Sequence, residues 1–187
     1  MTDALSWPRH QLTLPDWEAL PEDETLRLEV VEGMLVMAAQ PYSLHQRAER
    51  RLVNALEADL PTTFSGLHEV EVLLAEEPLT IRVPDVVVAS TDLVDSNPHR
   101  YRAADLHLAV EILSDGSRRV DRVLKFSEYA DAGVPQYWIL DLDAPTTLTA
   151  YVLVDGDYEL VAEATGTVDL TVAGHPVSLD LESLTRR

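Results

Sequence analysis

The sequence predicts a mixed α/β domain with a β-rich C-terminal part. Two near-continuous apolar runs, at residues 80–89 and 106–113, are typical of strands buried on both faces of a sheet. Over residues 43–60 the apolar positions instead recur with the period of an amphipathic helix. Strand and helix patterns that alternate in this way favour one packed unit. We therefore expect residues 1–187 to form a single domain, with residues 1–25 as an N-terminal arm.

The N-terminal half has distinct strand and helix patterns. Alternating apolar residues predict strands, and a Pro or Gly marks where most of them end. The expected elements are a helical turn anchored by Trp17, two short strands in 26–38 around Glu32–Gly33, a helix over 43–60 stopped by Pro61, a strand-like segment over 69–88 with a turn at 76–78, an apolar strand over 80–89, and a loop over 92–102.

The C-terminal half begins with the second apolar run and continues into antiparallel strands. Ser117 is a suitable N-cap, and Gly133 followed by Pro135 is a typical helix stop. The expected elements are a strand over 106–113, a helix over 118–132, a buried strand over 136–142, and antiparallel strands over 147–154, 158–162, 168–172 and 176–181 with a hairpin turn at 155–157.

The composition narrows the possible functions. The chain has no cysteine, which excludes disulfides, thiolate metal sites and cysteine nucleophiles. No apolar run approaches the roughly 18 residues of a membrane span, and no basic stretch precedes an apolar one at the N-terminus, so we expect a cytoplasmic protein without a signal peptide. The formal net charge of -19 argues against non-specific binding to a polyanion.

Two acidic residues interrupt the apolar strands. Asp85 lies among valines, and Glu111 lies between Val110 and Ile112. A carboxylate in such surroundings is costly unless it is paired, hydrogen-bonded or bound to a cation. If the two strands share a sheet, Asp85 and Glu111 can meet on one surface. Two carboxylates about 4 Å apart repel by about 4 kcal/mol at an effective dielectric constant of about 20, so we expect a proton or a hard divalent cation between them.

The single lysine of the chain is a third candidate. Of the 14 Lys and Arg residues, only Lys125 is a lysine, which favours a site that needs a compact ammonium group; chance in an Arg-rich chain explains it equally well. A helical wheel places Val123 and Leu124 on the apolar arc and Lys125 on the opposite, polar face. Asp121 precedes Lys125 by four residues, so a solvated ion pair is the simpler alternative.

Three segments resemble the Uma-type restriction-endonuclease family, a bacterial branch of the PD-(D/E)XK nuclease superfamily. The resemblance covers nearly the whole chain in the expected order, and it is carried by Val83-Pro84-Asp85-Val86-Val87-Val88, Val110-Glu111-Ile112-Leu113-Ser114, and Asp121-Arg122-Val123-Leu124-Lys125 continuing to Tyr137-Trp138-Ile139-Leu140-Asp141. It implies a restriction-endonuclease-like fold, with a mixed central sheet flanked by helices and an antiparallel C-terminal part. It also implies a Mg²⁺- or Mn²⁺-dependent endonuclease that acts on nucleic acid, with DNA the expected substrate, and a homodimer.

The resemblance assigns roles to matching positions. Asp85 and Glu111 would ligate the cation, together with the backbone carbonyl of Ile112. The superfamily pattern has a lysine at position 113, where this chain has Leu113, so the amine would come instead from Lys125 on the following helix. The cation would polarise a phosphodiester and acidify a water, and Lys125 would orient the nucleophile or stabilise the transition state.

Supporting roles are expected for three further residues. Glu29 would complete the metal environment, Asp121 would hold Lys125, and His45 would face the site, although a lone helical histidine is more often a surface or capping residue. Arginines of two helices form local basic clusters that could contact a phosphate backbone or simply be solvated: Arg47, Arg50 and Arg51, and Arg118, Arg119 and Arg122.

Two other functions stay open at this point. The net charge of -19 favours an inactive nuclease fold that acts as a dimerisation or regulatory module, whereas an intact acid, acid and lysine set disfavours it. A metal-dependent hydrolase of a small phosphoester would be less hindered by an acidic surface.

Overall fold

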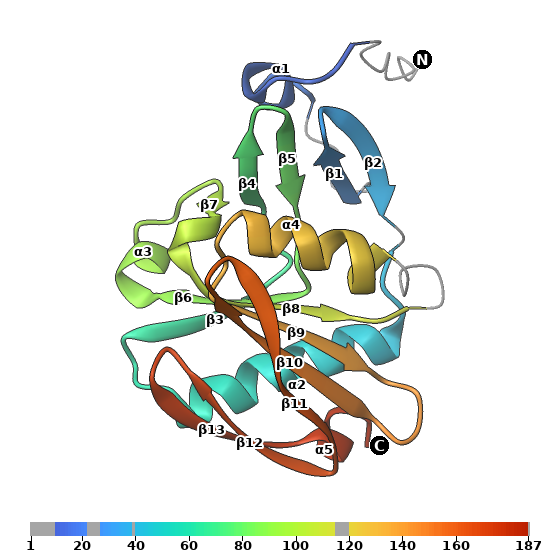
Figure 1. Ribbon diagram of the computed structural model, residues 1–187, viewed down its shortest axis with the longest axis vertical. Coiled ribbons are helices and arrows are strands. Elements are labelled where there is room, and N and C mark those ends of the chain that lie inside the picture. Colours follow the sequence, from blue (N-terminus) through green and yellow to red (C-terminus); the bar gives the residue numbers. More distant parts are fainter. Residues whose placement is uncertain (1–9, 22–26, 39, 115–119, 187) are drawn as a thin grey trace.

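A computed structural model describes residues 10–21, 27–38, 40–114 and 120–186, but not the side chains of residues 120–122 (Figure 1). Its strands form a five-stranded sheet, a six-stranded sheet and a hairpin. The strands are β1 (Arg27–Val31), β2 (Met34–Ala38), β3 (Phe64–His68), β4 (Val72–Glu76), β5 (Leu79–Arg82), β6 (Val86–Ser90), β7 (Tyr101–Arg102), β8 (Leu106–Ile112), β9 (Gln136–Asp141), β10 (Thr147–Val154), β11 (Asp157–Thr165), β12 (Thr167–Val172) and β13 (His175–Asp180).

The helices are few and mostly short. The one long helix, α2, coincides with the helix that the sequence predicts over 43–60. The helices are α1 (Leu14–Glu18), α2 (Ser43–Asp59), α3 (Thr91–Asp95), a 3₁₀ turn η1 (Ala103–Asp105), a π-helical segment η2 (Val120–Lys125), α4 (Phe126–Asp131) and α5 (Leu181–Thr185). No helix in these described ranges is long and apolar enough to cross a bilayer.

The mixed α/β fold class predicted from the sequence is confirmed, but the strands are divided between two larger sheets. The five-stranded sheet has the order β2-β1-β5-β4-β7, and the six-stranded sheet has the order β11-β10-β9-β8-β6-β3. Figure 1 shows the five-stranded sheet at the top, the six-stranded sheet across the middle and the β12-β13 hairpin at the bottom. Each of the two larger sheets contains one parallel pair, β4 with β7 and β8 with β9.

The division falls within a segment that the sequence predicts as one strand. Residues 80–89 are split between β5 and β6, and Val83–Asp85 forms a crossing from one sheet to the other. Pro84 explains the break, because it has no N–H to donate to a neighbouring strand. The crossing places Asp85 immediately before β6 of the six-stranded sheet.

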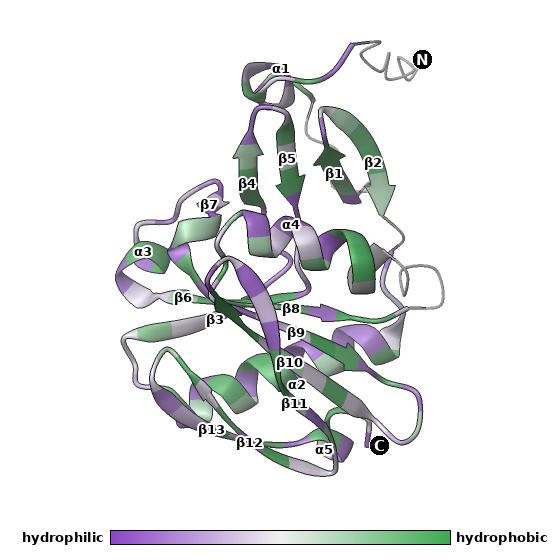
Figure 2. Ribbon diagram, in the orientation of Figure 1, coloured by the Kyte–Doolittle hydropathy of each residue, from purple (hydrophilic) through white to green (hydrophobic). Residues whose placement is uncertain are grey.

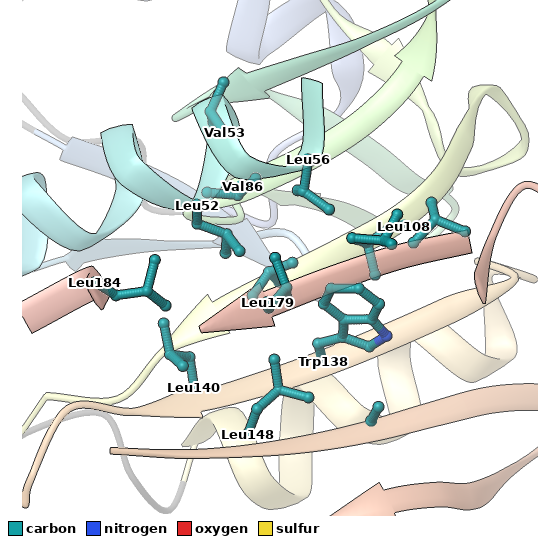
Figure 3. Packing of buried hydrophobic residues seen from close by; sticks show 14 of the residues in the cluster. Leu52, Val53, Leu56, Val86, Leu108, Trp138, Leu140, Leu148, Leu179 and Leu184 are labelled. Carbon is teal, nitrogen blue, oxygen red and sulfur yellow. The ribbon is translucent and has the colours of Figure 1, made fainter. Parts of the chain in front are cut away.

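One face of the six-stranded sheet packs against α2, α5 and the β12-β13 hairpin. Alternate residues of β6, β8 and β9 point to this face and form the apolar core with the buried face of α2 (Figure 3). In Figure 2, hydrophobic and hydrophilic residues alternate along α2, as expected of a helix with one buried face. The residues labelled in Figure 3 are Leu52, Val53, Leu56, Val86, Leu108, Trp138, Leu140, Leu148, Leu179 and Leu184.

The opposite face of that sheet packs against α4 and part of the five-stranded sheet. Tyr129 of α4 is fully buried there and packs against Tyr137 of β9, with ring centroids 5.1 Å apart. Phe126 and Tyr158 extend this aromatic group. Glu111 of β8 belongs to this face, because its neighbours Val110 and Ile112 point into the apolar core below.

The predicted orientation of the helix over 118–132 is wrong. Val123 and Leu124, which we expected on its buried arc, are 56% and 53% exposed, whereas Lys125 is only 7% exposed. The wheel assumes an α-helix, but η2 has a π-helical hydrogen-bond pattern, which changes the angle between successive residues. The expected N-cap Ser117 and the first two residues of the helix lie outside the described residues.

Five short elements were not predicted: β3, α3, β7, η1 and α5; the prediction of a loop over 92–102 is wrong at its two ends, where α3 and β7 lie. Arg51 of α2 belongs to one of the basic clusters that could contact a phosphate backbone. It donates instead to the carbonyl oxygens of Ser183 and Arg186, at 2.6 Å each. It therefore stabilises the C-terminal end of α5.

Candidate active site

The two acids that the sequence singles out are neighbours in the structure. The antiparallel register pairs Val86 of β6 with Val110 of β8, and one further step places Asp85 beside Glu111. The backbone N–H of Ile112 donates to Oδ2 of Asp85 at 2.6 Å. Asp85 is 3% exposed and Glu111 is 2% exposed, so both carboxylates are buried where the two sheets meet.

Glu111 is held by groups from the following helical segment. Nζ of Lys125 lies 2.7 Å from Oε2 of Glu111, and the hydroxyl of Tyr129 donates to Oε1 at 2.8 Å. Burial raises the pKa of Tyr129 well above its usual value, and the carboxylate of Glu111 raises it further, so this phenol remains a donor. Lys125 and Tyr129 are four residues apart, which brings both to one side of the helical segment.

Asp85 is surrounded by cationic side chains. Nη2 of Arg27 donates to its Oδ1 at 2.9 Å, and Nε2 of His45 lies 3.2 Å from the same oxygen. Burial tends to raise the pKa of Asp85, but His45, Arg27 and Lys125 outweigh this and hold that pKa below its ordinary value. Asp85 is therefore ionised at neutral pH.

Glu29 lies in the same region, where its oxygens bind protein groups. Nη1 of Arg82 donates to Oε2 at 2.7 Å, the N–H of Val83 donates to Oε1 at 3.1 Å, and Nζ of Lys125 lies 3.6 Å from Oε1. Burial tends to raise the pKa of Glu29, whereas Lys125 and Arg82 lower it below the ordinary value. Arg82 also donates to both oxygens of Glu128 on α4. Glu29 is thus a second carboxylate near Lys125, besides Glu111.

His45 and Glu49 face Asp85 from the first turns of α2. Nε2 of His45 lies 3.1 Å from Oε1 of Glu49. Neither atom has a hydrogen-bond partner among the described residues, although both are buried. Burial tends to lower the pKa of His45, but Asp85 and Glu49 raise it to about 9. One ligand atom from each of His45, Glu49 and Asp85 lies within 4.8 Å of the others.

These contacts test whether a divalent cation fits the site. Both oxygens of Glu111 are engaged by Lys125 and Tyr129, and those of Asp85 accept from Arg27 and the N–H of Ile112, so a cation would share Asp85 with these donors. Among the described residues, three buried side-chain atoms lack hydrogen bonds: Nε2 of His45 and Oε1 of Glu49, next to Asp85, and Nε of Arg27. A nitrogen and carboxylate oxygens that converge in a buried place are a suitable donor set for a divalent cation. The residues therefore fit a cation on the Asp85 side of the site.

The expected supporting residues have different outcomes. His45 does face the site, and Glu29 lies in it as a partner of Lys125 and Arg82. The side chain of Asp121 lies outside the described ones, so its contact with Lys125 stays a prediction. The carbonyl of Ile112 also stays a prediction as a ligand, since the contact seen at this residue is through its N–H.

Sequence reasoning missed four residues around the site: Arg27, Glu49, Arg82 and Tyr129. A signal existed for two of them. Arg82 interrupts the apolar run between Ile81 and Val83, much as Asp85 does. Glu49 follows His45 by four residues and lies beside Ala48 on the buried face of α2. Arg27 and Tyr129 are brought in by tertiary contacts that no local pattern records.

Two mixed sheets with few helices and a buried cluster of charged side chains define this mixed α/β protein. It resembles the crystal structure of "a putative nuclease belonging to DUF820" from Anabaena variabilis ATCC 29413, with a TM-score of 0.72 and 19% sequence identity over 93% of this chain and 97% of that one. The Uma2 family model, described as "Putative restriction endonuclease", matches residues 14–182, and the chain belongs to that family. The search of curated proteins found no match.

Proposed function

We propose that this protein is a metal-dependent nuclease that hydrolyses phosphodiester bonds of nucleic acid, with DNA as its expected substrate. The observation that carries the proposal is the placement of Asp85, Glu111 and Lys125 together, all buried, with Nζ of Lys125 2.7 Å from Glu111. Membership of a family described as "Putative restriction endonuclease" supports it.

Each residue has a part in the proposed chemistry. Hydrolysis needs a positioned water, a way to remove its proton, and positive charge near the phosphate as negative charge develops on its oxygens. Glu111 and Glu29 both pair with the ammonium group of Lys125. Lys125, so held, would orient the water and stabilise the developing charge. Tyr129 would keep Glu111 oriented by donating to its other oxygen.

Asp85 would hold the cation, because it is ionised and lies next to the buried atoms that lack hydrogen bonds. A divalent cation bound there would neutralise phosphate charge and make water easier to deprotonate. We propose Mg²⁺ or Mn²⁺ for this role.

The net charge of -19 leaves a second candidate function, the hydrolysis of a small phosphoester. A polyanion must approach against the field of the whole protein, whereas a small monoanionic diester meets less repulsion. The two functions therefore differ in the substrate that is cleaved faster.

The test is a cleavage assay with Mg²⁺ and Mn²⁺ on a plasmid, a DNA oligonucleotide, an RNA oligonucleotide and bis(p-nitrophenyl) phosphate. We expect the wild type to cleave DNA, and Lys125→Met and Asp85→Asn to lose about 100-fold or more of the rate, because each removes charge stabilisation at the reacting phosphate. Arg102→Gln is the matched control, since Arg102 pairs with Glu76 on the exposed surface.

Circular dichroism and thermal unfolding would establish that each variant is folded. Equal cleavage by the wild type and both site variants would refute the assignment of the site. Cleavage of the small diester alone would favour the second function. We also propose a homodimer, on the family resemblance alone, which sedimentation velocity would test.

A further inference from the structure

We propose that His45, Glu49 and Asp85 form the cation site, and that this site prefers Mn²⁺, or a similar transition ion, to Mg²⁺. The proposal names two ligands from α2 and the type of ion that they select. Its catalytic meaning rests on the nuclease function proposed above, but cation binding can be measured without any cleavage.

The geometry follows from two rigid parts of the fold. His45 and Glu49 are four residues apart on α2, so their side chains share one face of the helix. Ala48 and Leu52 anchor this part of the helix in the apolar core. Asp85 is fixed on the other side by the N–H of Ile112. The three ligand groups are thus held within 4.8 Å of one another by elements that do not depend on the ion.

The buried carboxylate of Glu49 supports the proposal independently of this geometry. Its side chain is 4% exposed, and its Oε1 lacks a hydrogen-bond partner among the described residues although it lies 3.1 Å from Nε2 of His45. A buried carboxylate oxygen without a donor is costly. Nε2 of His45 is in the same condition. The imidazole of His45 is protonated at neutral pH without an ion, so a cation that binds here displaces that proton to the solvent and then accepts lone pairs from both atoms.

The nature of the ligands selects the ion. Mg²⁺ prefers oxygen ligands and keeps several waters, whereas an imidazole nitrogen suits the borderline transition ions. One imidazole and two carboxylates leave positions open for water or a phosphate oxygen. Mn²⁺ accepts such a mixed set of oxygen and nitrogen ligands, so we expect it to bind here in preference to Mg²⁺.

A second histidine and a second carboxylate near Glu49 provide a control for the proposed ligands. His68 and Glu69 also lie within reach of Glu49, but both are exposed, and Glu69 is 3.5 Å from Arg27. His68 should therefore contribute little to binding. It offers a histidine beside the same carboxylate whose replacement leaves the proposed ligands intact.

The experiment is a titration of the whole protein with Mn²⁺, followed by the loss of the electron paramagnetic resonance signal of free Mn²⁺. We expect one bound ion in the wild type, and binding about tenfold weaker or more in Glu49→Gln and His45→Gln, since each loses a ligand. His68→Gln should bind as the wild type does. Bound Mn²⁺ should remain in the presence of about a tenfold excess of Mg²⁺.

Several outcomes would overturn the proposal: no Mn²⁺ bound by the wild type, unchanged binding in Glu49→Gln, weakened binding in His68→Gln, or ready displacement by Mg²⁺. Glu49→Gln conserves shape, so it keeps the test valid if His45→Gln fails to fold. This proposal and the proposed function can fail separately. If the wild type binds Mn²⁺ as expected but cleaves no substrate, the cation site stands and the nuclease function fails.

Discussion

Two buried regions of the molecule are held together by different interactions. The charged cluster, formed by Glu29, Glu49, Arg82, Asp85, Glu111 and Lys125, contains every buried charged side chain among the described residues. The apolar core between α2 and the six-stranded sheet consists of aliphatic side chains and Trp138 (Figure 3). Both regions are buried, but the first depends on matched charges and the second on contact area.

The two regions should respond differently to the replacement of a side chain. In the apolar core a truncated side chain loses contact area, and its neighbours can relax partly into the space. In the charged cluster the removal of one member leaves another charge buried and unpaired, and no neighbour can compensate by moving slightly. Four experiments would test this difference.

Arg82→Met should have the largest effect on stability. Arg82 pairs with Glu29 at 2.7 Å and with Glu128 at 2.6 Å, so its loss leaves the buried Glu29 without its closest cation. We expect the free energy of unfolding to fall by about 3–5 kcal/mol, measured by urea denaturation. Arg102→Gln, in an exposed ion pair, should change it by less than about 0.5 kcal/mol.

The double variant Arg82→Met with Glu29→Gln distinguishes an unpaired charge from lost packing as the cause of the destabilisation. If the cost comes from an unpaired charge, the double variant should be more stable than the sum of the two single changes predicts. Strict additivity would show that Arg82 contributes through packing instead.

Leu52→Ala should have a somewhat smaller effect. Leu52 is fully buried in the apolar core, and truncation removes contact area and leaves a cavity. We expect a loss of about 3 kcal/mol in the same urea experiment. A loss larger than that of Arg82→Met would contradict the expected difference between the two regions.

The smallest effect is a dependence of stability on alkaline pH in EDTA. The pKa of His45 is raised to about 9 in the folded protein, above its unfolded value of about 6.5. The stabilisation from the charged imidazole is therefore complete below about pH 6.5 and is lost as the pH rises through about 9. Unfolding by urea from pH 6 to 10 should show a decline in the wild type that is reduced in His45→Gln. Parallel curves for the two proteins would contradict the pairing.

The apolar core was largely predictable from the sequence. The period of apolar residues predicted α2, and the apolar runs predicted β8 and β9, because local alternation determines which face of an element is buried. The strand over 147–154 matches β10 residue for residue. Asp85 and Glu111 were also identified locally, since each is an acid within an apolar run.

The rest of the charged cluster was not predictable in this way. Lys125 is buried because Glu111 and Glu29 lie opposite it, and the wheel, which records only neighbours along the helix, placed it on the solvated face. Arg27 is separated from Asp85 by 58 positions in the sequence. Partners so distant are brought together by the topology of the two sheets, which hydrophobic patterns alone do not determine.

The crossing at Val83–Asp85 couples ligand binding to the arrangement of the sheets. The same three residues connect β5 to β6 and end in the carboxylate that we assign to the cation. An ion that binds Asp85 would also restrain the backbone torsions of the crossing at Val83–Asp85. A bound ion would therefore act as a clamp, and amide exchange would slow in both β5 and β6, beyond the ion's own contacts.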